Sequence, residues 1–128
     1  MKQSISFLLL LLLLAACSKP SVEEVVKQTV ERNYQALLSG HYELFLSGRA
    51  DTDSLPADYR SQLLDSYKQF MAQQQAAHGG ISSVMATNVQ MDSTQNVMQV
   101  FLMLNYADSL HEEIVVPMVM RNGEWKMK

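Results

Sequence analysis

His111, Glu112 and Glu113 are adjacent in the sequence and carry the side-chain types that acid–base chemistry requires. A carboxylate or an imidazole transfers protons at neutral pH when burial and a neighbouring hydrogen-bond donor tune its pKa. Charged residues at the start of a predicted strand are usually solvated, and this is the stronger interpretation of the cluster. The sequence therefore assigns no catalytic residue, and this cluster is where catalysis would be sought first.

The other polar groups do not form a pattern that would bind a metal ion. The three histidines, His41, His78 and His111, lie on different predicted elements, and no pair has ligand spacing. Residues 51–53 begin like a calcium loop, but Pro56 occupies the sixth position, where the loop requires glycine. We therefore predict no metal site and no cofactor.

Methionine is abundant, with nine residues in the chain. Thioether sulfurs bind Cu(I), and Met118 and Met120 would place two of them on one face of a strand. Most of the methionines stand among valines and leucines in predicted strands, however, which favours a role in core packing or in lining a pocket.

Cys17 is the only cysteine, and it directly follows Leu14-Ala15-Ala16 at the end of the apolar run 5–14. A basic start, a short apolar run and small residues before a cleavage point are typical of a secretion signal. The run is too short to span a bilayer, which takes about 20 apolar residues. The alternative, a secreted protein with an unmodified thiol, is the weaker interpretation.

The motif resembles the lipobox of bacterial lipoproteins. The resemblance implies that residues 1–16 are a signal peptide and that Cys17 is acylated, which would anchor the chain to a membrane. Two or more acyl chains hold a protein stably at a bilayer. Ser18 stands where some species use aspartate for inner-membrane retention, so we expect the outer membrane of a Gram-negative bacterium.

The remaining chain predicts one domain, residues 21–128, behind a short tether at 17–20. The formal net charge of −3 gives no electrostatic footprint for nucleic acid. With a single cysteine, no internal disulfide is available, so a packed core must supply the stability.

Helices are predicted in the first half of this domain. Apolar residues at helical spacing indicate a helix over 22–39, which begins with a capping box at Ser21 and ends at Gly40. A short helix is predicted over 41–46, and a third runs from Pro56 until Gly79 and Gly80 end it.

Strands are predicted in the second half, over 81–91, 97–106, 114–120 and 124–127, with turn residues between them. Pro117 predicts an edge or a bulge in the third strand. The strand 97–106 is apolar on one face and half apolar on the other. Either both faces are covered, or one of them lines a cavity.

This order predicts an α+β fold in which N-terminal helices pack on a curved, four-stranded antiparallel sheet. The helix 22–38 followed by Gly40-His41-Tyr42-Glu43, together with the ending 121–127, resembles the nuclear-transport-factor-two-like (NTF2-like, cystatin-like or ketosteroid-isomerase-like) superfamily. Within it, the chain looks most like small bacterial lipoproteins of unknown function, some of them lumazine-binding-like. The resemblance implies a cone-shaped domain that can dimerise through its sheet.

We expect a membrane-anchored binding or structural module that holds a small apolar ligand or a protein partner. The residues expected to line the binding site are Tyr34, Phe101, Met103 and Val119. A homodimer is a further expectation, because the superfamily dimerises through the sheet face. The alternative function is an enzyme with a ketosteroid-isomerase-like pocket, such as an isomerase, dehydratase or hydrolase.

Overall fold

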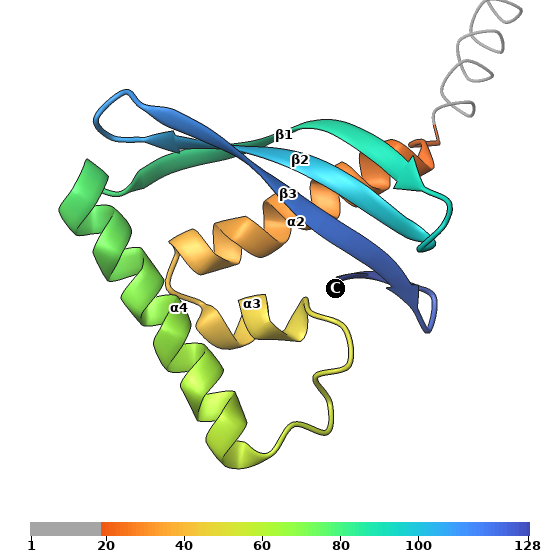
Figure 1. The fold of residues 1–128 in the computed structure, drawn as a ribbon, viewed down its shortest axis with the longest axis horizontal. Helices are drawn as coiled ribbons and strands as arrows, with labels where there is room; N and C mark the ends of the chain where they lie inside the picture. Colours follow the sequence, from red (N-terminus) through yellow and green to blue (C-terminus); the bar gives the residue numbers. More distant parts are fainter. Residues whose placement is uncertain (1–18) are drawn as a thin grey trace, which may run out of the picture.

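The computed structural model describes residues 19–128, which form three helices followed by four strands (Figure 1). The helices are α2 (Val22–Leu38), α3 (Tyr42–Ser47) and α4 (Ala57–His78), and the strands are β1 (Ile81–Asp92), β2 (Val97–Tyr106), β3 (His111–Arg121) and β4 (Glu124–Met127). The strands form one antiparallel meander in the order β1-β2-β3-β4. The expected α+β architecture is confirmed.

Helix α2 is the central helix of the core. Its first turn is capped as the sequence predicts, because the Ser21 hydroxyl accepts a hydrogen bond from the Glu24 backbone N–H at 3.2 Å. Val26 and Val30 are fully buried against the sheet. The helix ends before Gly40, whose φ of +78° is a conformation that glycine adopts without strain.

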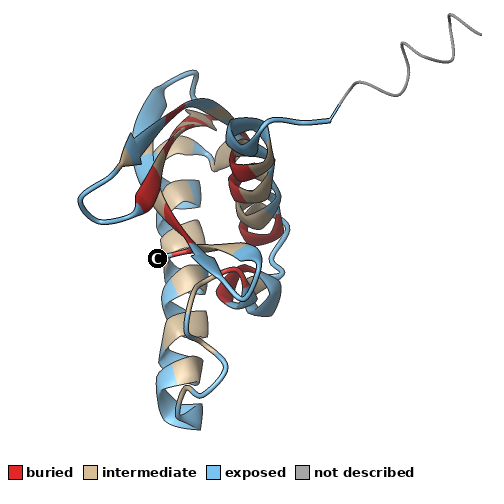
Figure 2. Cartoon of the chain, turned by 90° about the vertical axis from the view of Figure 1, so that its right-hand side faces the viewer, coloured by how far each residue is buried: buried red, intermediate tan, exposed pale blue. Residues whose placement is uncertain are grey.

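Helix α4 is the longest helix, but none of its residues is fully buried (Figure 2). Leu63, Tyr67, Phe70 and Gln74 form a half-buried stripe at helical spacing, while Tyr59, which has the same spacing, is exposed. The helix therefore packs against the rest of the domain along one side only, and its other side is exposed to solvent. Within residues 19–128, no helix combines the length and the hydropathy that crossing a bilayer would need.

Strand β2 lies in the middle of the sheet, and from Met98 onward buried and half-buried residues alternate along it. Val100, Leu102 and Leu104 are buried in the core cluster beneath α2, while Phe101 and Met103 between them point to the opposite face. This confirms the expected difference between the two faces of the strand, and within residues 19–128 no helix lies over the second face (Figure 1).

Two register shifts in β1 disrupt its pairing with β2, one of them between Ala86 and Asn88. Such bulges bend a strand and increase its twist, which curves the sheet around α2. Helix α2 also contacts the bulge directly, because the Glu31 carboxylate accepts a hydrogen bond from the Ala86 N–H at 2.9 Å. The bulge therefore helps to fix the position of α2 on the sheet.

Strand β3 begins at His111, three residues before the start that the sequence predicts at Ile114. The missed residues are polar and exposed, so their hydropathy does not mark them as strand, yet they continue the backbone pairing with β2. Pro117 lies just beyond the β3–β4 ladder, which begins at Met118. Its missing N–H therefore removes no bond of that ladder.

The chain after α3 covers part of the outer edge of the sheet. Met127 donates its N–H to the Gly48 carbonyl at 2.8 Å and accepts from the Ala50 N–H at 2.7 Å. Residue Arg49 thus forms a parallel bridge to Met127 in β4. The bridge closes this edge of the core around Met127, which is buried.

Candidate functional site

A hollow of about 530 Å³ that reaches the core lies between α4, the C-terminal half of α2 and the β2–β3 pair. We call it the aromatic cavity. It is lined by Tyr34, Leu37, Phe45, Ser66, Tyr67, Phe70, Gln74, Leu104, Tyr106, Glu112 and Ile114. Cavities of this size and apolar lining, with a few polar groups, are typical of small-molecule sites.

Three aromatic rings in the wall pack edge to face. The ring centroids of Tyr34 and Phe45 are 5.2 Å apart, and those of Phe45 and Tyr67 are 4.9 Å apart. Edge-to-face pairs are favourable because the positive edge of one ring meets the negative face of the next. The pairs hold α2, α3 and α4 together at this point and fix the orientation of the wall.

Glu112 is the only carboxylate among the described residues that line the aromatic cavity. It pairs with Leu104 across the β2–β3 ladder, and directly opposed residues share a face of the sheet. Its side chain is therefore on the cavity side, although the residue is exposed at the rim. The Tyr106 hydroxyl donates a hydrogen bond to Glu112 Oε2 at 2.8 Å.

Burial and the neighbouring Glu112 carboxylate raise the pKa of the Tyr106 hydroxyl to about 12. Burial also raises the pKa of Tyr34, with a further contribution from Tyr67. Both phenols are therefore protonated at neutral pH and act as hydrogen-bond donors. The polar side of the cavity thus combines phenolic donors with one carboxylate acceptor.

A smaller hollow of about 250 Å³ continues from the aromatic cavity and shares Tyr34, Phe45 and Tyr67 with it. Arg49 and Lys128 line this part, where Arg49 Nη1 lies 3.4 Å from the Tyr67 hydroxyl. The combined groove therefore has an acidic rim at Glu112 and basic groups in its other part, with aromatic rings between them.

His78, the last residue of α4, supports the cavity from behind Tyr106. Its ring stacks on the Tyr106 ring with centroids 4.0 Å apart, and its Nδ1 lies 2.8 Å from Asp108 Oδ2. The hydrogen bond with His78 lowers the pKa of the Asp108 carboxyl. The contact between His78 and Asp108 is not predicted from the sequence, because it joins residues 30 positions apart.

The structure does not bring the four predicted lining residues together. Tyr34 lines the aromatic cavity, whereas Phe101 and Met103 lie on the sheet face that points away from α2. Val119 pairs with Lys126 and is buried outside the central core cluster. Cys17, the predicted acylation site, lies outside the described residues.

The predicted acid–base cluster is divided between the two faces of β3. Glu112 faces the cavity, while His111 pairs with Asn105 and Glu113 pairs with Met103, both on the opposite face. The pairing of Tyr106 with Glu112 is not predicted from the sequence. The signal was available, because Glu112 follows Tyr106 across a short turn that brings two strands side by side.

Among residues 19–128, no group of three or more His, Cys, Asp and Glu side chains is close enough to hold a metal ion. The carboxylate of Asp51 instead lies 3.5 Å from Arg121 Nε, in an exposed ion pair.

No protein-family model and no curated protein matches the sequence. Among solved structures, the chain is similar to a protein from Campylobacter jejuni named "Putative NTF2-like transpeptidase". The TM-score is 0.62 at 8% sequence identity, and the match covers 78% of this chain and 94% of that one. The chain has an NTF2-like fold. At such low identity the similarity extends to the NTF2-like fold alone and assigns no activity.

Proposed function

We propose that this protein is a lipid-anchored binding module of the bacterial cell envelope. Its NTF2-like domain binds a small, largely apolar molecule in the aromatic cavity. The observation that carries the proposal is the cavity itself, about 530 Å³ in volume and lined by the five aromatic residues Tyr34, Phe45, Tyr67, Phe70 and Tyr106. Burial of apolar surface against such rings is the main source of affinity at sites of this kind.

The polar groups of the cavity indicate the chemistry of the ligand. Glu112 accepts hydrogen bonds at the rim, so a ligand that carries an amine or another donor group would bind there. Its apolar or aromatic body would then pack along Phe70, Tyr67 and Phe45. We therefore favour an amphipathic molecule with one cationic or hydrogen-bond-donating end.

The anchoring part of the proposal rests on Cys17 and the residues before it. The order of basic start, seven consecutive leucines, two alanines and a cysteine supports acylation at the thiol. An acylated protein stays at the membrane face, which would hold the cavity near molecules that reside in or pass through the envelope. The outer membrane of a Gram-negative bacterium remains our proposal for its location.

Native mass spectrometry of the protein extracted with mild detergent tests both parts. We expect the mass of a chain that begins at Cys17 with attached acyl groups, together with a retained small molecule. Gln74→Trp, which fills the cavity from α4, should abolish the retained mass, and Gln73→Trp on the exposed side of α4 should leave it. A wild-type protein that carries no small molecule after native extraction would contradict the binding role.

The Glu112 carboxylate beside the Tyr106 hydroxyl supports a second candidate function, that of an acid–base enzyme. A carboxylate in a concave pocket next to a phenol is an arrangement that acid–base enzymes use. If the retained molecule were converted to a product by the wild type and not by Glu112→Gln, with binding unchanged, the enzyme would replace the binding module as the function.

A further inference from the structure

A second concave surface lies on the other side of α2 from the aromatic cavity. This hollow, of about 410 Å³, is bounded by α2, α3 and the β3–β4 hairpin, and we call it the α2–β4 hollow. Val25, Leu44 and Trp125 supply its apolar lining, and Arg32 and Lys126 supply its basic groups. The proposed ligand site uses none of these residues.

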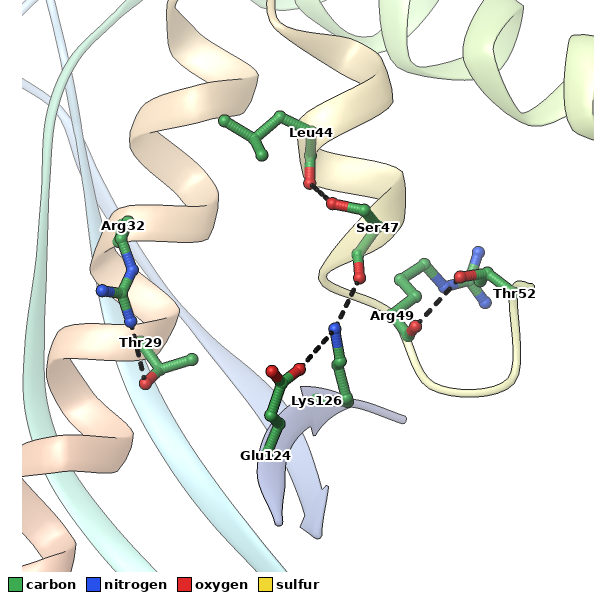
Figure 3. Close-up of polar contacts among 8 residues, drawn as sticks. All are labelled: Thr29, Arg32, Leu44, Ser47, Arg49, Thr52, Glu124 and Lys126. Atoms are coloured by element: carbon green, nitrogen blue, oxygen red, sulfur yellow. Dashed lines mark hydrogen bonds and ion pairs between the residues drawn. The ribbon is translucent and has the colours of Figure 1, made fainter. Parts of the chain in front are cut away.

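Figure 3 shows the polar groups at the border of this hollow. The Lys126 ammonium donates to the Ser47 carbonyl at 3.0 Å and pairs with Glu124 at 3.2 Å, so it is already engaged. Arg32 makes only a long hydrogen bond of 3.4 Å to the Thr29 hydroxyl. It has no carboxylate partner among the described residues, and its guanidinium is exposed to bind an anion.

Three large apolar side chains around the hollow are exposed to solvent. Val22 lies one turn before Val25 on α2, Leu44 lines the hollow from α3, and Met120 pairs with Trp125. Their exposed fractions are 58%, 60% and 46%. Apolar side chains gathered around one tryptophan and a free arginine match the interfacial region of a bilayer, where tryptophan and arginine are both favoured.

The position of the anchor brings this surface to a membrane. Helix α2 begins at Val22, five residues after Cys17, and an extended chain of that length spans at most about 18 Å. An acyl group on Cys17 therefore holds the start of α2 within reach of the headgroup layer. The inference below rests on the proposed anchoring of the chain.

We propose that the surface formed by the α2–β4 hollow with Val22, Leu44 and Met120 lies against the bilayer that carries the anchor. Trp125 then sits at the interface, and Arg32 contacts a lipid phosphate. Glu23 and Glu24 in the first turn of α2 and Glu124 in β4 offset the basic residues nearby. Apolar contact, with one phosphate contact from Arg32, therefore holds the surface to the membrane.

Trp125 is the only tryptophan in the chain, so its fluorescence reports directly on this surface. The acylated full-length mature protein would be reconstituted in vesicles of phosphatidylethanolamine and phosphatidylglycerol, with and without bromine on the acyl chains. Because bromine quenches tryptophan only at close range, we expect emission in brominated vesicles to fall to about half of that in unlabelled vesicles.

Leu44→Ser should reduce this quenching, because it removes an apolar contact beside Trp125. Leu110→Ser is the matched control, since Leu110 is exposed to 59% and lies in the β2–β3 turn, away from the hollow. Both substitutions replace exposed side chains, so both variants should fold. Arg32→Gln should weaken the quenching in the same vesicles, because it removes the contact with a lipid phosphate. Circular dichroism should show an unchanged fold.

The outcomes separate this inference from the proposed anchoring. If the protein floats with the vesicles and Trp125 is not quenched, the anchoring stands and the docking surface is wrong. If Trp125 is quenched equally in the wild type, Leu44→Ser and Leu110→Ser, Trp125 lies near the lipid but Leu44 makes no contact with it, and the docking surface as proposed is wrong. If the purified protein lacks acyl groups and does not float, the anchoring itself fails, and the docking surface fails with it.

Discussion

Tyr106 is the residue on which the polar side of the cavity depends. Its hydroxyl donates to Glu112 at 2.8 Å, and its ring stacks against His78 with centroids 4.0 Å apart. The residue thus joins the rim of the cavity to the end of α4. Because its pKa is raised to about 12, it remains a donor throughout the physiological pH range.

The raised pKa of Tyr106 predicts a loss of stability in alkali. The folded state holds the Tyr106 proton up to about pH 12, while the unfolded chain releases it from about pH 10. The unfolded state therefore binds fewer protons between these values, and the free energy of unfolding falls as pH rises. Urea unfolding at pH 9 and pH 11 should show a smaller fall in Tyr106→Phe than in the wild type.

Tyr34 has a raised pKa too, so Tyr106→Phe should reduce this alkaline loss without abolishing it. Tyr59→Phe, at an exposed tyrosine on α4, is the control and should behave like the wild type. An equal alkaline loss in Tyr106→Phe and the wild type would show that burial and Glu112 do not raise the pKa of Tyr106 in the folded protein.

At the scale of elements, the contact between α2 and the end of α3 depends on a glycine. A Cβ atom at Gly48 would meet the side-chain atoms of Asn33 at 2.8 Å. Burial of Asn33 costs free energy of folding, because its Nδ2 atom has no hydrogen-bond partner within residues 19–128. Helix α2 and the end of α3 thus approach each other so closely at Gly48 that there is no room for a larger side chain.

Gly48→Ala should therefore destabilise the fold by about 1–3 kcal/mol, through overpacking against Asn33. In the double variant with Asn33→Ala, the added methyl group has room, and most of this loss should be recovered. Denaturant unfolding of the four proteins in a double-mutant cycle gives the coupling. Additive losses in the double variant would show that Asn33 is not the group that limits the space.

Helices α2 and α4 should differ in their local stability. The described part of α2 has fully buried residues such as Val26 and Val30, whereas α4 has none. Segments with few buried contacts open more readily than the core. We expect hydrogen–deuterium exchange to be faster in α4 than in the middle of α2, and a ligand in the aromatic cavity should slow α4 selectively. Equal protection of both helices would contradict this expectation.

The elements could be predicted from sequence because apolar periodicity, caps and turn residues mark them locally. The residues of the cavity could be predicted only in part, because the side of the sheet on which the helices pack is a property of the assembled fold. Tyr34 lies on a helix that must face the sheet, so its position beside the cavity could be predicted. Phe101 and Met103 were not separable from cavity residues, because both faces of β2 are apolar.

At the scale of the whole molecule, the sheet has one face under α2 and one face open. Phe101 and Met103 lie on the open face, and the neighbouring Met85 and Val115 are exposed to 54% and 48%. An exposed apolar patch on a sheet favours association with a second copy. This is the surface through which the expected homodimer would form.

Sedimentation velocity over a range of concentrations, in detergent, tests this expectation. We expect the wild type to self-associate and Val115→Lys to remain monomeric, because a charge at the centre of an apolar interface is costly to bury. Gln73→Lys, which adds the same charge on the exposed side of α4, should associate like the wild type. A wild type that is monomeric at every concentration would rule out the open face as a dimer interface.

Helix α2 contributes buried core residues and α4 contributes cavity wall, and this difference affects how the protein can evolve. The buried residues that keep the domain folded lie on α2, α3 and the sheet, whereas α4 supplies much of the cavity wall from positions that are not fully buried. Substitutions at Phe70 or Gln74 can therefore alter what the cavity accepts while the domain stays above its folding threshold. Descendants of one ancestral chain could diverge in ligand preference through this single helix.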